Sequence, residues 1–269
     1  MSDQGSDHVV ELTADGAVLR RRRREAGGLS ADREAELLAL VAPSLPVPVP
    51  RVGRVVDEDT LVLERLPGVP LLDSLPAAPP WCRARLGSVL GRVIAALAMV
   101  PVERVASVVP VDDAPHEEYV DEAAALVRDL GAALPADRRG AVLRFLSATP
   151  PRQPPTLVLC HHDLGAENLL VDPDDLRITG VLDWSDAAIT DPALDLGLVL
   201  RDLGRAGFEH AVAAVTATGI PLGDVVERAE FHARVRALED LAFGVEHDLA
   251  RYRDNALRAI GQVFDPTHG

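Results

Sequence analysis

VLCHHDLGAENLLVD, residues 158–172, places two adjacent histidines, an aspartate and an asparagine between two apolar runs. The apolar runs predict short β-strands, and the polar residues between them predict a loop. Three interpretations of this loop are open: a metal site, an acid–base site and a buried polar turn. The other motifs of the chain decide among them.

A zinc site formed by His161 and His162 is disfavoured by strand geometry. Side chains of adjacent residues on a strand point to opposite faces, so the two rings would not converge on one ion. The chain also has no Cys/His cluster with the spacing of zinc ligands. Its two cysteines, Cys82 and Cys160, lie far apart in the sequence, and we expect both to be reduced thiols. A buried polar turn would explain one histidine but not the acidic and amide residues that follow.

The pattern H-x-D-L-x-x-x-N, the catalytic-loop pattern of protein kinases, fits His161, Asp163 and Asn168. Asp183 follows at the end of the next apolar run, in GVLDWSDA. Phosphoryl transfer needs Mg²⁺ on the phosphates and an acceptor hydroxyl held in line. A carboxylate and a carboxamide supply the oxygen ligands that Mg²⁺ prefers, and another carboxylate can accept or orient the proton of the hydroxyl. The two motifs together predict phosphoryl transfer.

CHHDLGAENLLVD, followed by GVLDWSDAAITDPALDLG, resembles the aminoglycoside phosphotransferase family of small-molecule kinases. The resemblance implies an α+β, two-lobed protein-kinase-like fold, with a small antiparallel-sheet N-lobe and a larger, mainly helical C-lobe. It implies that Asp163 is the catalytic base and that Asn168 and Asp183 are Mg²⁺ ligands. The family usually has a glycine after the first histidine, where this chain has His162, and the other positions of the signature match.

Three further residues of these motifs are expected to have structural roles. The resemblance implies that His161 braces the catalytic loop. It also implies that Asp191 and Asp195 fix the segment after the metal loop, which is the loop that carries Asp183. The dipeptide Asp191-Pro192 is a favourable helix start.

The distribution of strands and helices predicts two lobes. Strand patterns, a hairpin turn at Asp15-Gly16 and one helix predict an N-terminal nucleotide-binding lobe over residues 1–66. We expect the first strand of this lobe to be shortened or to lie upstream of Met1. The segment LPGVPLLDSLPAAPP interrupts regular structure and predicts the boundary. Residues 67–269 predict a C-terminal helical lobe with the catalytic loop, the metal loop and the acceptor site.

A kinase needs a basic residue on a strand of its N-lobe, paired with a glutamate on the next helix. The chain has no lysine, and all 27 of its basic residues are arginine. Arg20 is the predicted phosphate contact, because VLR lies where the family often has a strand ending in Lys or Arg. Arg22 would share the same strand face and is the alternative. Glu34 lies on the apolar stripe of the following helix, where a buried acid needs a partner such as arginine.

The other nucleotide contacts are implied by the resemblance. Family members commonly have a glycine loop between two strands, and GSDHVVEL is its counterpart, with Gly5 and Ser6 over the phosphates. LVLERLPGVPL resembles the family's hinge, which would bring the Glu64 carbonyl and the Leu66 amide to the purine. The implied cofactors are Mg²⁺ and either ATP or GTP, between which the sequence does not distinguish.

Charge and hydropathy limit the partners. A net charge of −15 argues against binding a nucleic-acid backbone. It fits a cationic small molecule, although a solvated acidic surface is the commoner explanation of such a charge. No run approaches the roughly 18 consecutive apolar residues of a membrane span, and no secretory signal is recognisable, so we expect a cytoplasmic protein without a membrane partner. The sequence does not indicate the oligomeric state.

The acceptor is expected in the helical lobe, where acidic residues would meet a cationic drug. The predicted contacts are Glu239, Asp240 and Glu246 in ALEDLAFGVEHDLARYRD, and apolar residues of the same helix would also suit a macrolide. We predict a small-molecule O-phosphotransferase that moves the γ-phosphate to a hydroxyl of an aminoglycoside, macrolide or peptide antibiotic and so gives resistance. The alternatives are a metabolic kinase of a sugar or amino alcohol, and a nucleotide-binding protein without catalysis. A protein kinase is disfavoured, because no A-P-E segment follows Asp183.

Overall fold

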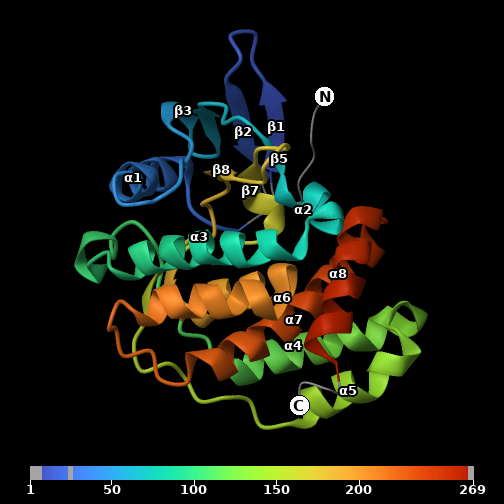
Figure 1. Cartoon of the computed structure of the whole chain (residues 1–269). Helices are drawn as coiled ribbons and strands as arrows, with labels where there is room; N and C mark the ends of the chain where they lie inside the picture. Colours follow the sequence, from blue (N-terminus) through green and yellow to red (C-terminus); the bar gives the residue numbers. More distant parts are fainter. Residues whose placement is uncertain (1–7, 24–26, 266–269) are drawn as a thin grey trace. The chain divides into compact units, whose positions relative to one another are not determined.

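The computed structural model of the chain describes residues 8–23 and 27–265 (Figure 1). The chain divides into two compact units, each assembled from segments that are distant in sequence. Unit 1 comprises Met1–Ser74, Arg92–Asp112 and Val158–Thr190, and unit 2 comprises Leu75–Gly91, Asp113–Leu157 and Asp191–Gly269. The predicted boundary at residue 66, between a nucleotide-binding lobe and a helical lobe, stays a prediction. The two compact units do not show which residues bind a nucleotide.

Unit 1 contains a four-stranded antiparallel sheet in the order β1-β2-β4-β3. Its strands are β1 (His8–Leu12), β2 (Val18–Arg22), β3 (Val52–Asp57) and β4 (Thr60–Leu63). The predicted hairpin is present, with His8 opposite Arg22 and Leu12 opposite Val18. Helix α1 (Ala31–Val41) lies beside β3, as Figure 1 shows, and buries its apolar stripe. Side chains alternate between the two faces of β2, and α1 has one apolar face. These patterns therefore direct Arg20 of β2 and Glu34 of α1 into the interior of unit 1.

The motif segments of unit 1 lie on short, buried strands. A three-stranded sheet has the order β5-β7-β8, and β6 pairs with β9. These strands are β5 (Val69–Pro70), β6 (Val158–Cys160), β7 (Leu169–Val171), β8 (Ile178–Val181) and β9 (Ala188–Thr190). Unit 1 also contains the short helices α2 (Leu71–Ser74), η2 (Val102–Arg104) and η4 (Ala166–Asn168). The catalytic-loop motif thus joins β6 to β7, and Asp183 lies two residues after the end of β8, so buried strands anchor both loops.

Unit 2 is helical. It contains η1 (Leu75–Ala77), α4 (His116–Leu130), η3 (Gly131–Ala133), α5 (Ala136–Ser147), α6 (Ala193–Thr216), α7 (Val225–Glu246) and α8 (Ala250–Val263). Figure 1 shows α6 and α7 side by side, and residues of α4, α5, α7 and α8 share one apolar core. Among the described residues, no helix is both long and apolar enough to cross a membrane.

Helix α3 (Pro80–Ala98) contributes its residues up to Gly91 to unit 2 and its last turns to unit 1. Two of its glycines allow a close approach to α6. A β-carbon at Gly87 would lie 1.9 Å from the carbonyl oxygen of Gly207, and one at Gly91 would lie 2.5 Å from the Cα atom of Ala211. Only glycine fits at positions 87 and 91 of this helix crossing.

Candidate functional site

The loop after β6 begins with a fully buried histidine, His161. The backbone N–H of Asp163 donates to its Nδ1 at 3.3 Å, so the proton of the ring lies on Nε2 and is donated to the carbonyl oxygen of Leu182 at 2.9 Å. The ring also packs edge-on against Trp184, with ring centroids 4.5 Å apart. His161 therefore joins the start of the catalytic loop to the loop that follows β8.

Asp163 and Asn168 are held together across the catalytic loop. The side-chain amide of Asn168 donates to Oδ2 of Asp163 at 2.6 Å and to the backbone carbonyl of Asp163 at 2.9 Å. These bonds orient the carboxylate of Asp163. They use the NH₂ group of the amide, so its oxygen is the atom that can bind a metal ion.

Asp183 lies two residues after the end of β8 and its backbone is in the left-handed region, with φ 53°. Its Oδ1 accepts hydrogen bonds from Arg20 at 3.0 Å and from the Ser185 hydroxyl at 2.9 Å, and its Oδ2 lies 3.3 Å from Nδ1 of His8. Burial raises the pKa of the Asp183 carboxyl, but the hydrogen bond from His8 and the positive charge of Arg20 outweigh burial. The pKa therefore lies well below its ordinary value, and the group is an ionised carboxylate at neutral pH.

Arg20 connects Asp183 to helix α1. Besides its bond to Asp183, its guanidinium forms an ion pair with Glu34, whose side chain is 2% exposed. Burial raises the pKa of Glu34 above its ordinary value, although Arg20 opposes this effect. One buried guanidinium thus serves two carboxylates.

Arg22, the alternative to Arg20, has other partners. Its guanidinium binds the carboxylate of Asp59 at 2.6 Å and the carbonyl oxygen of Gly28 at 3.0 Å. Asp59 lies 37 residues away in the sequence, so the alternation along β2 does not reveal this partner. Of the two arginines, only Arg20 contacts Asp183 among the described residues.

The family model of the phosphotransferase enzyme family matches residues 2–257. The chain belongs to this family. A viomycin phosphotransferase of Streptomyces vinaceus is 30% identical over 210 residues, covering 75% of this chain and 72% of that enzyme. An aminoglycoside 3'-phosphotransferase of Streptomyces fradiae is 33% identical over 172 residues, covering 58% of this chain and only 59% of that enzyme's length.

The solved GDP complex of aminoglycoside 2'-phosphotransferase-IIIa has a TM-score of 0.70 to this phosphotransferase. The match covers 97% of this chain and 90% of that one, at 22% sequence identity. It confirms the predicted α+β, protein-kinase-like fold.

We predict that Arg20→Ala weakens the binding of Mg²⁺–nucleotide to this phosphotransferase, whereas Arg22→Ala leaves it nearly unchanged. A hydrogen bond between charged groups contributes about 1.5–3 kcal/mol, so the loss for Arg20→Ala is roughly 10- to 100-fold in affinity. Isothermal titration calorimetry measures both variants, with thermal unfolding as the check on folding, because Glu34 loses its buried partner. Equal affinities for the two variants would contradict the assignment of Arg20.

The structure describes two of the four other predicted nucleotide contacts. Glu64 and Leu66 lie in the segment between β4 and β5. The backbone N–H of Glu64 donates to the carbonyl oxygen of Arg51 at 2.8 Å, and the side chain of Leu66 covers Gly180 of β8. Gly5 and Ser6 lie outside the described residues. The nucleotide roles of these four residues stay predictions.

Two of the three acids predicted to meet the acceptor are paired with arginines of unit 2. Asp240 accepts from Arg201, which is 1% exposed, at 2.8 Å, and Glu239 lies 3.1 Å from Arg236. Glu246, at the end of α7, is exposed. Arg201 precedes Asp240 by 39 residues, so no local pattern predicts their pairing. Pairing with an arginine makes Glu239 a weaker attractor of a cation than its sequence suggests, whereas Asp240 shares Arg201 with Asp202.

Asp191 and Asp195 are both buried in unit 2. Oδ1 of Asp191 accepts from the backbone N–H of Ala193 at 3.0 Å, at the start of α6, and Oδ2 accepts from Nε of Arg228 at 2.5 Å. Asp191 therefore ties the start of α6 to α7 by a buried ion pair. The sequence signals the helix start but not Arg228.

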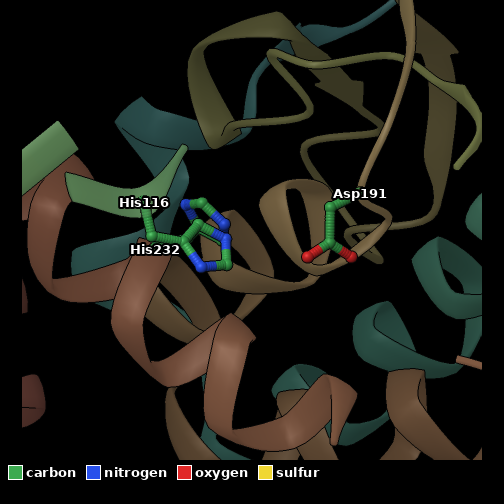
Figure 2. A group of neighbouring side chains, drawn as sticks. All are labelled: His116, Asp191 and His232. Atoms are coloured by element: carbon green, nitrogen blue, oxygen red, sulfur yellow. The ribbon is translucent and has the colours of Figure 1, made fainter. Parts of the chain in front are cut away.

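Figure 2 shows that Asp191 also faces two histidines, His116 of α4 and His232 of α7. One potential ligand atom from each residue lies within 4.8 Å of the others, a spacing that could hold a metal ion. Asp191 is already neutralised by Arg228, however, and Nδ1 of His116 is bonded to the carbonyl oxygen of Pro151 at 2.9 Å. We therefore assign these side chains to the packing of unit 2.

Proposed function

We propose that this phosphotransferase moves the γ-phosphoryl group of a Mg²⁺-bound nucleoside triphosphate to a hydroxyl group of an antibiotic. The proposal is carried by the cluster around Asp183, where Arg20 and His8 hold an ionised carboxylate beside the buried Glu34. A buried acid kept ionised by a cation shared with a helix glutamate is the arrangement on which phosphoryl transfer in kinases depends.

The donor atoms of this cluster suit Mg²⁺. The carboxylate of Asp183 and the amide oxygen of Asn168 are hard oxygen donors of the kind that Mg²⁺ binds, and they would be its protein ligands. When bound, the ion neutralises charge that develops on the phosphates. Arg20 would contact the phosphates from β2, in the place of the kinase lysine.

Asp163 would act on the acceptor hydroxyl. Its carboxylate is oriented by the Asn168 amide and by the backbone bond to His161, so its position in the loop is defined before substrate binds. An oriented carboxylate can accept the proton of the hydroxyl or direct its lone pair at the phosphorus atom. Preorganisation of this kind is the contribution that the protein makes to phosphoryl transfer.

The proposed acceptor class rests on the relatives and on charge. Two relatives are named for phosphorylating viomycin and an aminoglycoside. A net charge of −15 favours a cationic acceptor through the overall field of the protein. Resistance to the antibiotic would be the physiological consequence of its phosphorylation.

Mass spectrometry of an antibiotic panel tests this proposal. The protein is incubated with Mg²⁺, either ATP or GTP, and aminoglycoside, viomycin-type and macrolide antibiotics in separate reactions. We expect one class to gain the mass of one phosphoryl group, and the rates with ATP and GTP to identify the donor. An Asp163→Asn sample is the control for transfer by contaminating enzymes. Binding of Mg²⁺–nucleotide without any product would contradict an antibiotic acceptor, and failure to bind nucleotide would contradict the phosphotransfer site itself.

A further inference from the structure

His162 has a backbone conformation that its side chain does not favour. Its φ is 71°, in the left-handed region where a β-carbon causes strain and glycine does not. It follows His161 and precedes Asp163, at the position where the family signature usually has glycine. A strained residue beside a catalytic group indicates that its side chain contributes something that glycine would not.

The imidazole of His162 lies between two partners in unit 1. Its Nδ1 is 3.2 Å from the backbone carbonyl oxygen of Asp186, and its Nε2 is 3.3 Å from Oδ2 of Asp112. The carbonyl oxygen can only accept, so Nδ1 carries a proton, and a bond from Nε2 to the carboxylate of Asp112 requires a second proton on the ring. Asp186 belongs to the same loop as Asp183, and the ring therefore joins the catalytic loop to the metal loop.

The backbone of Asp112 holds its carboxylate in place beside the ring, and the carboxylate attracts the ring when both ring nitrogens carry a proton. The backbone N–H of Asp112 donates to the carbonyl oxygen of Ile189 in β9 at 3.0 Å, and the preceding Val111 forms a bridge with Ile189. The carboxylate of Asp112 is 26% exposed and the ring of His162 is 20% exposed, so solvent only partly screens their interaction. Three segments of unit 1 thus meet at this one side chain.

We propose that His162 is a positioning residue for phosphoryl transfer. Its ring, anchored by Asp112, holds the catalytic loop against the loop that carries Asp183, and so fixes Asp163 at the acceptor hydroxyl. The proposal rests on the proposed function of this site. A displacement of about 1 Å at a reacting group costs roughly 100-fold in rate, so a loose loop would lower kcat without preventing nucleotide binding.

The variant His162→Gly distinguishes the effect of the ring from the effect of the backbone conformation. Glycine adopts φ 71° without strain, so we expect an unchanged or higher Tm together with a kcat about 10- to 100-fold lower and an unchanged KM for the nucleotide. Asp112→Ala should lower kcat similarly, and the double variant should be no slower than the slower single variant, because both changes remove one shared contact. His162→Asn, which tolerates the left-handed region and retains a donor, should recover part of the lost rate.

The matched control is Asp113→Asn, which removes the same charge from an exposed neighbour of Asp112 and should leave kcat unchanged. A kcat of His162→Gly equal to that of the wild type would overturn the proposal, as would losses that multiply in the double variant.

Hydrogen exchange of the backbone amides of residues 163–172 keeps the test independent of the acceptor. Faster exchange in both Asp112→Ala and His162→Gly supports the positioning role, even where the wild type phosphorylates no antibiotic and the proposed function fails. Unchanged exchange in Asp112→Ala, whose loop sequence is intact, would overturn the role.

Discussion

Asp163→Asn is expected to lower kcat by about 10²- to 10⁴-fold, the usual contribution of a general base, while the affinity for Mg²⁺–nucleotide stays nearly unchanged. Asparagine has almost the same shape as aspartate and keeps an oxygen that can accept the bond from Asn168 at this position. It cannot accept a proton from the acceptor hydroxyl. Steady-state kinetics with the acceptor found by mass spectrometry measures kcat, and calorimetry measures nucleotide affinity.

Asp174→Asn provides the control for this variant. Asp174 lies exposed in the turn between β7 and β8, so its replacement makes the same change in charge without changing the catalytic loop. Its kcat should equal that of the wild type. If Asp163→Asn retains wild-type turnover, Asp163 is not the base, and another group must act on the acceptor hydroxyl.

Asp183→Asn is expected to lower the Mg²⁺-dependent affinity for nucleotide by about 100-fold or more, because even residues that only support metal ligands cost roughly 10- to 100-fold when replaced. The ionised carboxylate becomes a neutral amide, which is a poorer ligand for a divalent cation. Arg20 and His8 also lose an anionic partner. Calorimetric titrations with nucleotide in Mg²⁺ and in EDTA separate the metal-dependent affinity from the rest.

Ser185→Ala is the matched comparison, because it removes only the 2.9 Å hydrogen bond to Asp183 and leaves the carboxylate in place. Its effect on Mg²⁺-dependent affinity should be smaller than that of Asp183→Asn. Thermal unfolding of both variants checks that the buried cluster still folds. If Asp183→Asn keeps the full difference in nucleotide affinity between Mg²⁺ and EDTA, this carboxylate does not bind the metal.

Local patterns predicted much of the fold and of the chemistry, because they depend on residues close together in the chain. The hairpin around Asp15-Gly16 and the buried stripe of α1 follow from turn chemistry and periodicity, and both are present. The loop residues Asp163 and Asn168 also bond to each other across five positions. For such short separations, the residue types and the spacing already restrict the possible partners.

Contacts over long separations depended on the tertiary structure. The sequence by itself determined the family motifs, the strand that carries Arg20 and Arg22, and the helix face that carries Glu34. The sequence also predicted that Arg20 pairs with Glu34. Only the tertiary structure showed that Asp183 shares this arginine and that Asp59 binds Arg22. Periodicity specifies the face on which a side chain lies, whereas its partner depends on which distant segment packs against that face.

The same distinction holds for His162 and for the acids of α7. The sequence by itself determined that histidine replaces the family's glycine and that acidic residues cluster near residue 240. Only the tertiary structure brought Asp112 to His162 and Arg201 to Asp240. These pairs form because strands and helices distant in the chain pack side by side, and no pattern within either segment encodes that packing.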